Sequence, residues 1–354
     1  MKNEVLIIAS VNLLKSLVVN PSFSGDEAVT ANIIELWFKD NNLNYKRYKN
    51  NLWACNKYFD SKKPTVLLNS HHDTVKPNKG YTLNPFNAEI KEGKLFGLGS
   101  NDAGASLVCL AHVFLNFYNQ KELKYNLVFA ASAEEEISGK NGLKSILKML
   151  PKIDFAVVGE PTKMQMAIAE KGLLVIDGYA SGKSGHAAHK NTVNAISEAM
   201  QDINWLHKYK FKKKSAVLGD VKTSVTQINA GLQHNVVPEK CHFVIDVRVN
   251  ENYQNKEVFA VLDKHTKSNL IPRSFNLNSS GISEDHPFVQ FGKSLGLNVY
   301  GSPTLSDQSV LNCPSLKIGP GDSTRSHSAD EFIFLSEIEE GIEIYLKLFN
   351  YILK

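Results

Sequence analysis

The stretch Leu67–Val75 reads Leu-Leu-Asn-Ser-His-His-Asp-Thr-Val. Residues 65–68 are apolar and partly β-branched, which predicts a short buried strand. Open α/β sheets bind their ligands at the carboxyl ends of strands, and His71, His72 and Asp73 stand at that position. His71 and Asp73 point the same way on an extended backbone, so the carboxylate could orient the imidazole or contact what the imidazole binds. Taken alone, the stretch is equally consistent with a solvated polar turn.

The composition is that of a globular protein of more than one domain. The chain has 354 residues, of which 43% are hydrophobic and 21% charged, and a net charge of +4. This length exceeds one ordinary core and suggests two domains. The small net charge gives no reason to expect a nucleic acid or a membrane as partner. The one dense basic run, Lys208–Lys214, is more typical of a solvated loop than of a binding patch.

The cysteines and the N-terminal residues indicate the cellular compartment in which the protein is expected. Four scattered cysteines without a metal-ligand spacing predict free thiols in a reducing compartment. Polar residues interrupt the apolar N-terminal stretch, and no signal-peptide cleavage pattern follows it. No run approaches the roughly 20 apolar residues of a membrane span. We therefore expect a cytoplasmic protein.

Acidic residues follow two further predicted strands. Asn126–Ser132 leads into the three glutamates Glu134–Glu136, and Phe155–Val158 leads into Glu160. A Gly-rich turn places Asp102 at the start of a predicted helix. Each acidic turn alone is typical of a surface, but buried strands of one sheet would bring these carboxylates to the same edge as the histidines. A last histidine, His327, stands beside acids after another Gly-rich turn, within Arg325–Glu331.

Histidines, glutamates and an aspartate at strand ends are the ligands of hard-to-borderline divalent metals. One bridging aspartate and four single-atom ligands suffice for two metals about 3.5–4 Å apart. Such a pair activates water and polarises a carbonyl, which suits hydrolysis of an amide. A further carboxylate must remain free of metal to carry the proton from the water to the leaving nitrogen.

A self-contained unit interrupts this pattern. Residues 172–280 are predicted to run strand, helix, strand, strand, helix, strand, which is the ferredoxin-like order, with the last strand at 274–278. The α/β pattern resumes at 316–318. The predicted fold is therefore α/β: a metal-bearing domain with a central mixed sheet, built from residues 1–171 and 281–354, and an inserted domain at 172–280.

Eight short motifs stand in a fixed order along nearly the whole chain: Ser70–Val75, Gly99–Asp102, Glu134–Glu136, Val158–Thr162, Gly182–His186, Asn235–Pro238, Asp246–Arg248 and Arg325–His327. Their order and spacing resemble the acetylornithine deacetylase family of zinc amidohydrolases. That family also contains succinyl-diaminopimelate desuccinylase, aminoacylase and glutamate carboxypeptidase. Each motif alone is weak, whereas the ordered set is highly specific. The resemblance implies that the inserted domain is a lid and dimerisation domain.

The resemblance also implies two divalent metal ions, zinc or cobalt. His71 and Glu160 would bind one ion. Glu136 and His327 would bind the other, and Asp102 would bridge the two.

Three residues receive catalytic roles from the same resemblance. Asp73 would orient His71, and Glu135 would be the general base. His186, on the inserted domain, would stabilise the developing oxyanion, and in several relatives it does so in the partner subunit's site. Asn235 and Arg248, on the same domain, would hold the substrate's carboxylate.

The substrate stays open among several N-acyl amino acids. Acetylornithine deacetylase, in arginine biosynthesis, fits best, and a variant acting on acetyl- or succinyl-citrulline is not separated from it. The desuccinylase has Thr-Ser-Asp-Gly-Arg where Leu305–Ser309 reads Leu-Ser-Asp-Gln-Ser, and the missing arginine argues against that substrate. A metallo-exopeptidase is also possible, but it would need a pocket for a free amino terminus, and the sequence shows no dedicated acidic cluster for one. A non-catalytic binding protein on this scaffold is disfavoured because every catalytic position is filled.

Overall fold

The computed structural model describes residues 2–354, with side chains from Val5 onward. The chain divides into two compact units. The first comprises Met1–Ile168, Gly281–Tyr300 and Ser306–Lys354, and the second comprises Ala169–Ser280 and Gly301–Leu305. The short segment Gly301–Leu305 was assigned from the sequence to the metal-bearing domain. It belongs instead to the second unit, where the Ser302 carbonyl accepts a hydrogen bond from the Lys171 amide at 3.1 Å.

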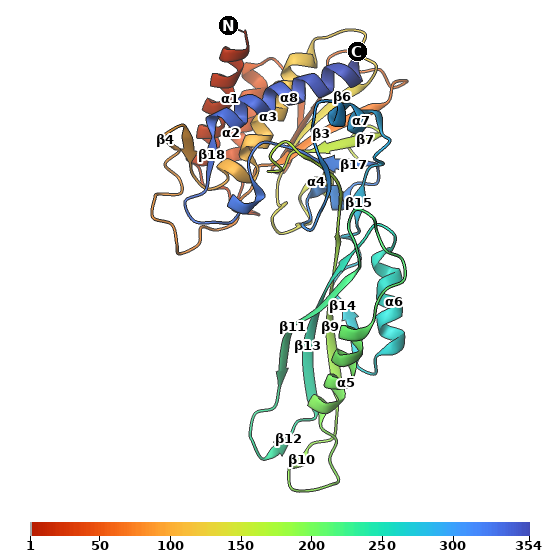
Figure 1. Cartoon of the computed structure of the whole chain (residues 1–354). Coiled ribbons are helices and arrows are strands. Elements are labelled where there is room, and N and C mark those ends of the chain that lie inside the picture. Colours follow the sequence, from red (N-terminus) through yellow and green to blue (C-terminus); the bar gives the residue numbers. More distant parts are fainter. Residues whose placement is uncertain (1) are drawn as a thin grey trace. The chain divides into compact units, whose positions relative to one another are not determined.

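A nine-stranded mixed sheet carries the first unit (Figure 1). Its order is β1-β2-β6-β3-β7-β17-β8-β15, with β16 also pairing β8. The strands β6, β3, β7 and β17 are parallel, whereas β1, β2 and β8 run antiparallel to their neighbours. The strands are β1 (Tyr45–Tyr48), β2 (Asn51–Cys55), β3 (Thr65–His71), β6 (Asn126–Ser132), β7 (Phe155–Val158), β8 (Met166–Glu170), β15 (Ser280–Gly281), β16 (Val299–Ser302) and β17 (Ser315–Lys317).

The central strands are buried on both faces. Along β3, Val66 and Leu68 pack into the core on one face, and Leu67 packs into a smaller core on the other. A strand covered on both faces needs apolar residues at every position, which explains the continuous run after position 64. The predicted α/β fold with a central mixed sheet is confirmed.

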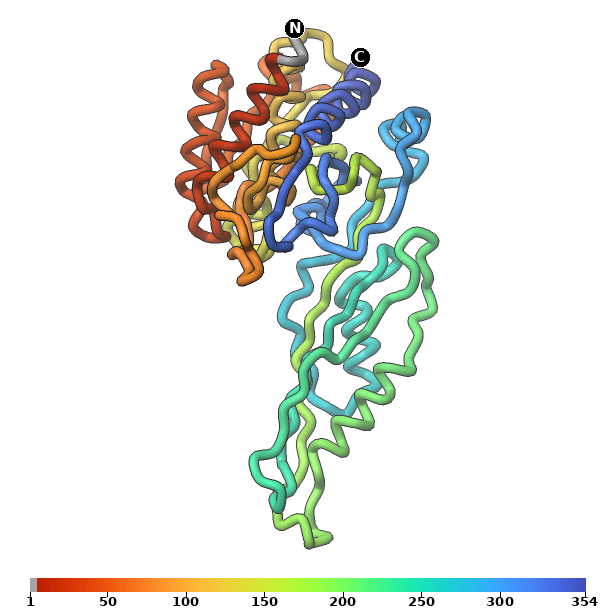
Figure 2. Tube along the Cα trace, turned by 60° about the vertical axis from the view of Figure 1, so that its left-hand side comes forward, coloured from red at the N-terminus to blue at the C-terminus, as the bar shows by residue number. Residues whose placement is uncertain are grey.

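Helices cover these faces. α3 packs on β3 and β6 and contacts α1 and α8, and α8 also contacts α7. Figure 2 shows the first helix, in red, beside the last, in blue, although they stand at opposite ends of the sequence. The helices of this unit are α1 (Lys2–Val18), α2 (Ala28–Asp40), α3 (Ala105–Tyr118), α4 (Leu143–Ile146), α7 (Pro287–Ser294) and α8 (Leu335–Leu353).

The first unit also contains a separate three-stranded sheet, whose last strand directly precedes α8. Its order is β18-β5-β4, and all its pairs are antiparallel. The strands are β4 (Glu89–Lys91), β5 (Lys94–Phe96) and β18 (Phe332–Phe334). Because β18 pairs with β5, the segment around residue 327 is joined to the chain that precedes Asp102.

The second unit has a four-stranded antiparallel sheet in the order β11-β13-β9-β14 and a separate two-stranded antiparallel sheet, β10–β12. The strand predicted at 274–278 is wrong: the last strand is β14, earlier in the chain. Hydrophobic residues of the sheet pack against two helices. The elements are β9 (Gly172–Ser181), β10 (Gly185–His186), α5 (Ala195–Lys208), β11 (Lys222–Ala230), β12 (Val236–Val237), β13 (Lys240–Val249), α6 (Asn255–His265) and β14 (Asn269–Pro272).

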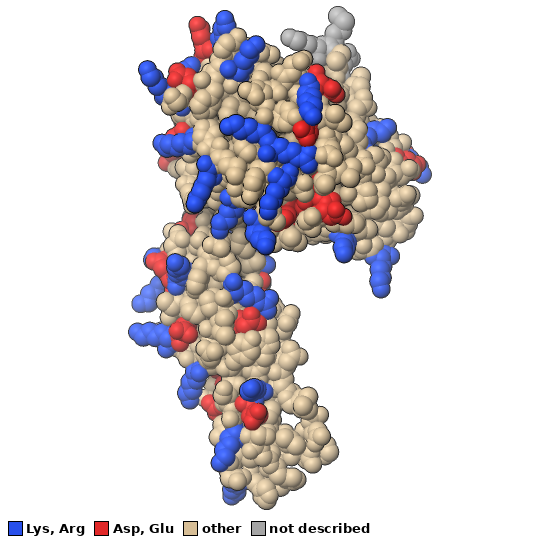
Figure 3. Space-filling model, turned by 180° about the vertical axis from the view of Figure 1, so that it is seen from behind, with Lys and Arg blue, Asp and Glu red and all other residues tan. Residues whose placement is uncertain are grey.

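The charged side chains of both units are of mixed sign. On the face drawn in Figure 3, acidic residues stand among the lysines and arginines of each unit. Within residues 2–354, none of the helices combines the length and the apolar character that a membrane crossing needs.

Candidate metal centre

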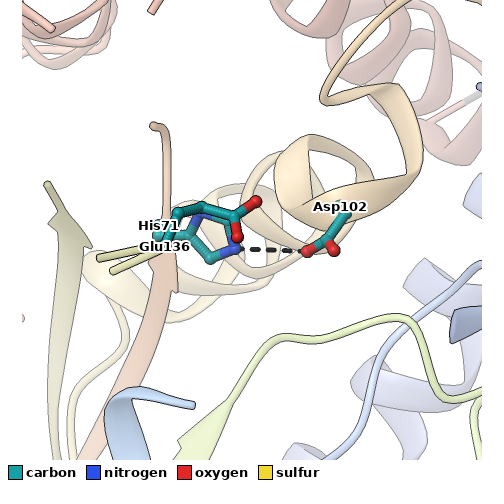
Figure 4. Close-up of side chains that lie close together, drawn as sticks. All are labelled: His71, Asp102 and Glu136. Carbon is teal, nitrogen blue, oxygen red and sulfur yellow. Dashed lines mark hydrogen bonds and ion pairs between the residues drawn. The ribbon is translucent and has the colours of Figure 1, made fainter. Parts of the chain in front are cut away.

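His71 is the last residue of β3, and its imidazole is almost fully buried, with 1% of the side chain exposed. Its Nε2 lies 3.3 Å from Oδ1 of Asp102 and 3.9 Å from Oε1 of Glu160. Figure 4 shows Asp102 reaching toward the ring from the turn that leads into α3. Glu160 follows β7, the parallel neighbour of β3. Parallel strands thus bring the histidine and the glutamate to one edge of the sheet.

His327 faces the other side of Asp102. Its Nε2 lies 2.9 Å from Oε2 of Glu136 and 3.7 Å from Oδ2 of Asp102. The backbone of His327 is in the left-handed region, with φ +58°, and its carbonyl accepts a hydrogen bond from Nδ2 of Asn78 at 3.0 Å. A non-glycine residue held in that region is a reason to look for function.

The two oxygens of Asp102 therefore face two different histidines. Oδ1 is on the side of His71 and Glu160, and Oδ2 is on the side of Glu136 and His327. Two ligand atoms about 2.1 Å from one tetrahedral ion lie about 3.4 Å apart. The observed separations of 2.9–3.9 Å lie around that value. The structure thus brings together all five residues that the sequence analysis named as metal ligands.

Glu135 lies at the same place, with Oε2 4.0 Å from Nε2 of His71. Two groups of three potential metal ligands can be drawn around that histidine: one with Asp102 and Glu136, the other with Glu135 and Glu160. Geometry therefore allows Glu135 to act either as a ligand or as a base beside the ions.

The electrostatics reflect several carboxylates packed around one buried imidazole. Burial raises the pKa of Glu135 well above its usual value, and burial with the nearby charge of Asp102 raises the pKa of Glu160 to about 8. Burial alone would lower the pKa of His71, but Asp102 and Asp73 outweigh it and raise that pKa well above the ordinary value. A cation at this place would relieve the repulsion among the carboxylates.

Asp73 does more than the sequence analysis expected. Nδ1 of His71 lies 2.9 Å from the backbone oxygen of Asp73 and 3.5 Å from its carboxylate Oδ1, so the carbonyl takes the closer contact. The carboxylate accepts hydrogen bonds from the backbone amides of Glu135 and Glu136, at 3.0 and 3.2 Å, and from Ser24 Oγ at 2.7 Å. Asp73 thus fixes both the imidazole and the turn that carries the glutamates.

Glu27 was missed by the sequence analysis and completes that arrangement. It is 1% exposed, and its Oε1 accepts a hydrogen bond from the amide of Glu134 at 3.2 Å. Glu134 has φ +53°, and its carboxylate accepts two hydrogen bonds from Asn141. With Asp73, three successive amides of the turn are held by carboxylates. A lone glutamate at the start of a helix gives no sequence signal for this role.

Asp307 and Glu331 are two further buried carboxylates near the site that the sequence analysis missed. Asp307 accepts a hydrogen bond from Ser132 Oγ, at 2.5 Å, and burial raises its pKa to about 6. Glu331 accepts hydrogen bonds from three backbone amides of the turn that holds Asp102. Both sit near named motifs, but only long-range contacts distinguish them from solvated acids.

The remaining predicted residues lie in the second unit. His186 pairs with Val236 in the two-stranded β10–β12 sheet, and the backbone oxygen of the adjacent Asn235 accepts a hydrogen bond from the amide of Ala187 at 3.0 Å. The structure thus places His186 and Asn235 together. Arg248 stands apart, near the far end of β13.

Arg248 forms a two-point ion pair with Asp246, with Nε–Oδ1 at 2.9 Å and Nη2–Oδ2 at 3.1 Å. Residues two apart on a strand point the same way, so the sequence Asp-Val-Arg could have predicted this pair.

Comparison with known proteins identifies the family. The model of peptidase family M20/M25/M40 matches residues 67–351. A succinyl-diaminopimelate desuccinylase of Rickettsia bellii is 25% identical, over 83% of this chain and 82% of its own length. An acetylornithine deacetylase of Proteus mirabilis is 26% identical, over 94% of each chain.

Solved structures agree on the fold. A Bacillus subtilis protein described as a dinuclear metal binding peptidase from the M20 family superposes with a TM-score of 0.74 at 16% identity, covering 98% of each chain. The resemblance drawn from the sequence motifs is confirmed at the level of the family. Because the family model spans most of the chain, this protein belongs to peptidase family M20/M25/M40 and is a metal-dependent amide hydrolase.

Proposed function

We propose that this hydrolase holds two divalent ions, zinc or cobalt, and removes the acyl group from an N-acyl amino acid. One ion would be held by His71 and Glu160, the other by Glu136 and His327. The observation that carries the proposal is the placement of Asp102 between the two histidine–glutamate pairs. Its Oδ1 faces His71 and its Oδ2 faces His327. Imidazole nitrogens with carboxylate oxygens are a donor set that zinc and cobalt accept.

Two ions held here would supply an activated water and polarise the amide carbonyl. The chain itself must then move a proton from the water to the leaving nitrogen. We assign this to Glu135, because Glu136 is already directed at Nε2 of His327 at 2.9 Å. Glu135 faces the same cluster at a greater distance, 4.0 Å from Nε2 of His71. The Asp73 carboxylate accepts hydrogen bonds from the backbone amides of both glutamates and so fixes the backbone from which the two side chains project.

The substrate we favour is N2-acetyl-L-ornithine, which gives ornithine and acetate in arginine biosynthesis. The relative of Proteus mirabilis named acetylornithine deacetylase supports it over nearly the full length of both chains. A desuccinylase relative has similar identity, but the arginine of that enzyme's motif is absent from Leu305–Ser309. In that segment Gln308 is buried and donates to Ser315 Oγ at 3.1 Å. N-acylcitrullines and dipeptides are the alternative substrates.

We propose further that the enzyme is a homodimer through the second unit. If His186, Asn235 and Arg248 all act on one bound substrate, a single copy of that unit cannot supply them. His186 and Asn235 lie at the two-stranded β10–β12 sheet, beyond the end of β13 that starts at Lys240, and Arg248 lies near the other end of β13. These two ends are about 26 Å apart, at about 3.3 Å per residue. One chain would provide Arg248, and the partner would provide His186 and Asn235.

The first prediction concerns substrate and metal together. With zinc or cobalt added, the enzyme should hydrolyse acetylornithine with a higher kcat/KM than acetylcitrulline, succinylcitrulline, succinyl-diaminopimelate or dipeptides. Exhaustive chelation should abolish the activity, and either metal should restore it. The measurement is release of free amino groups across this panel.

Two results would overturn the proposal in different ways. Undiminished hydrolysis by a preparation shown to be metal-free by elemental analysis would remove the metal mechanism. Preference for dipeptides over all N-acyl amino acids would make the protein an exopeptidase.

The second prediction separates two adjacent glutamates. Glu135→Gln should retain metal content but lose roughly 100- to 10,000-fold in kcat, which is the usual contribution of a general base. Glu136→Gln, the matched control, should chiefly lower metal content. Both are read by elemental analysis and steady-state kinetics. The opposite pattern would show that Glu135 is the ligand and Glu136 the base.

The third prediction tests the dimer. His186→Ala should lower kcat by roughly 100- to 1,000-fold, as loss of one oxyanion donor does, with metal content unchanged. The control is His189→Ala, which should retain activity. The His189 ring is a neighbour of His186, with the two ring centroids 5.6 Å apart. Mixing inactive His186→Ala subunits with inactive Glu135→Gln subunits should restore activity, because each mixed dimer would contain one intact site. No recovery despite demonstrated subunit exchange would place His186 in its own chain's site.

A further inference from the structure

We propose that Glu331 is a positioning residue that sets where the carboxylate of Asp102 stands between the two histidines. The inference rests on the proposed function, because it takes Asp102 as the ligand shared by both ions. Glu331 itself is 1% exposed and directs its carboxylate at the backbone of the Asp102 turn.

The contacts of Glu331 cover that whole turn. Its Oε1 accepts hydrogen bonds from the amides of Asn101 and Asp102, at 2.8 and 2.9 Å, and its Oε2 accepts one from Gly99 at 3.1 Å. Its backbone oxygen accepts a fourth from the amide of Gly97, at 2.9 Å. Burying a carboxylate is costly, and these hydrogen bonds offset part of that cost.

Gly99 shows that the turn is shaped for this contact. It has φ +78°, a left-handed conformation that glycine adopts at little cost. A Cβ added there would lie 2.6 Å from Cγ2 of Thr74, so a larger residue would also collide with the chain after β3. Glycine therefore lets the backbone turn its amide toward Glu331 at the lowest conformational cost and without displacing Thr74.

The side chain of Asp102 is short, so its oxygens move nearly as far as its backbone moves. Its amide is bonded to Glu331, and on the other side of the turn Asn101 exchanges two hydrogen bonds with the backbone of Asp322, at 2.9 and 3.1 Å. Releasing Glu331 would leave Asp102 held from one side. The distances of 3.3 and 3.7 Å from its oxygens to the two histidines would then no longer be fixed.

Glu331 also ties the Asp102 turn to the segment of His327. The two residues are four apart in the chain, and Asp330 between them bonds to Thr82 and Leu83. One short segment therefore presents His327 to Oδ2 of Asp102 and holds the amide of the same aspartate. Glu331 therefore couples the position of His327 to that of Asp102.

The test compares Glu331→Gln with Asp330→Asn. The glutamine has the same shape but presents an NH2 group to a backbone amide and so loses at least one of the hydrogen bonds. Asp330 is a matched control, because its carboxylate also accepts three hydrogen bonds, from Thr82 N, Thr82 Oγ1 and Leu83 N, and none involves the Asp102 turn. Zinc dissociation constants are measured by competition with a chromophoric chelator, with unfolding midpoints and kcat and KM alongside.

Glu331→Gln should weaken zinc binding by about 10- to 100-fold, as loss of a partner behind a metal ligand does, and lower kcat with little change in KM. Asp330→Asn should shift the unfolding midpoint without weakening zinc binding. Glu331→Asp, which keeps the charge but withdraws it by one methylene, should fall between wild type and Glu331→Gln.

Each outcome is decisive. If wild type fails to bind zinc, the proposed metal centre is wrong. If wild type binds zinc and Glu331→Gln binds it equally well, or both variants at positions 330 and 331 weaken it alike, the positioning role is wrong. Should Glu331→Gln not fold, Glu331→Asp decides: zinc binding equal to wild type would overturn the inference, and weaker binding would support it.

Discussion

The structure depends on keeping several carboxylates close together at the carboxyl ends of the parallel strands of the mixed sheet. Asp102, Glu135, Glu136 and Glu160 are brought there by three different segments, around the buried imidazole of His71 at the end of a fourth. Like charges at such distances repel, and burial makes the repulsion stronger. The raised pKa values of Glu135 and Glu160 express that cost. A site of this kind is stable when cations bind between the carboxylates, and it must be held in shape by the rest of the fold.

The fold holds it through the backbone. Glu27 and Asp73 accept the three successive amides of the glutamate turn, and Glu331 accepts three amides of the Asp102 turn. The side chains that we propose to carry the chemistry are thereby left free to face bound ions and a substrate. The same solution, a buried carboxylate bonded to a run of amides, occurs on two turns that are unrelated in sequence. The parallel strands β3 and β7 supply the frame, because each is covered by apolar side chains on both faces.

The sequence was most informative where a pattern repeats. The apolar run of β3 and the acids after strands predicted the sheet edge, and the ordered motifs that resemble the acetylornithine deacetylase family named the five residues that meet there. It was least informative where one residue makes a long-range contact. Asp330-Glu331 looks like any acidic pair, and only the fold shows that one carboxylate faces a loop at 82–83 and the other the Asp102 turn. The strand misplaced to 274–278 has a local cause, because β14 at Asn269–Pro272 is shorter and polar at its start. Gly301–Leu305 joins the second unit through a backbone hydrogen bond that no periodicity encodes.

The central claim is that Asp102 is shared by two ions, with His71 and Glu160 on one side and Glu136 and His327 on the other. The most direct measurement is a crystal structure of the zinc-loaded enzyme, with anomalous diffraction collected at the zinc edge. The account predicts two anomalous peaks about 3.5–4 Å apart, one against each oxygen of Asp102. Two peaks with Asp102 bound to only one of them, or full activity with a single peak, would contradict it.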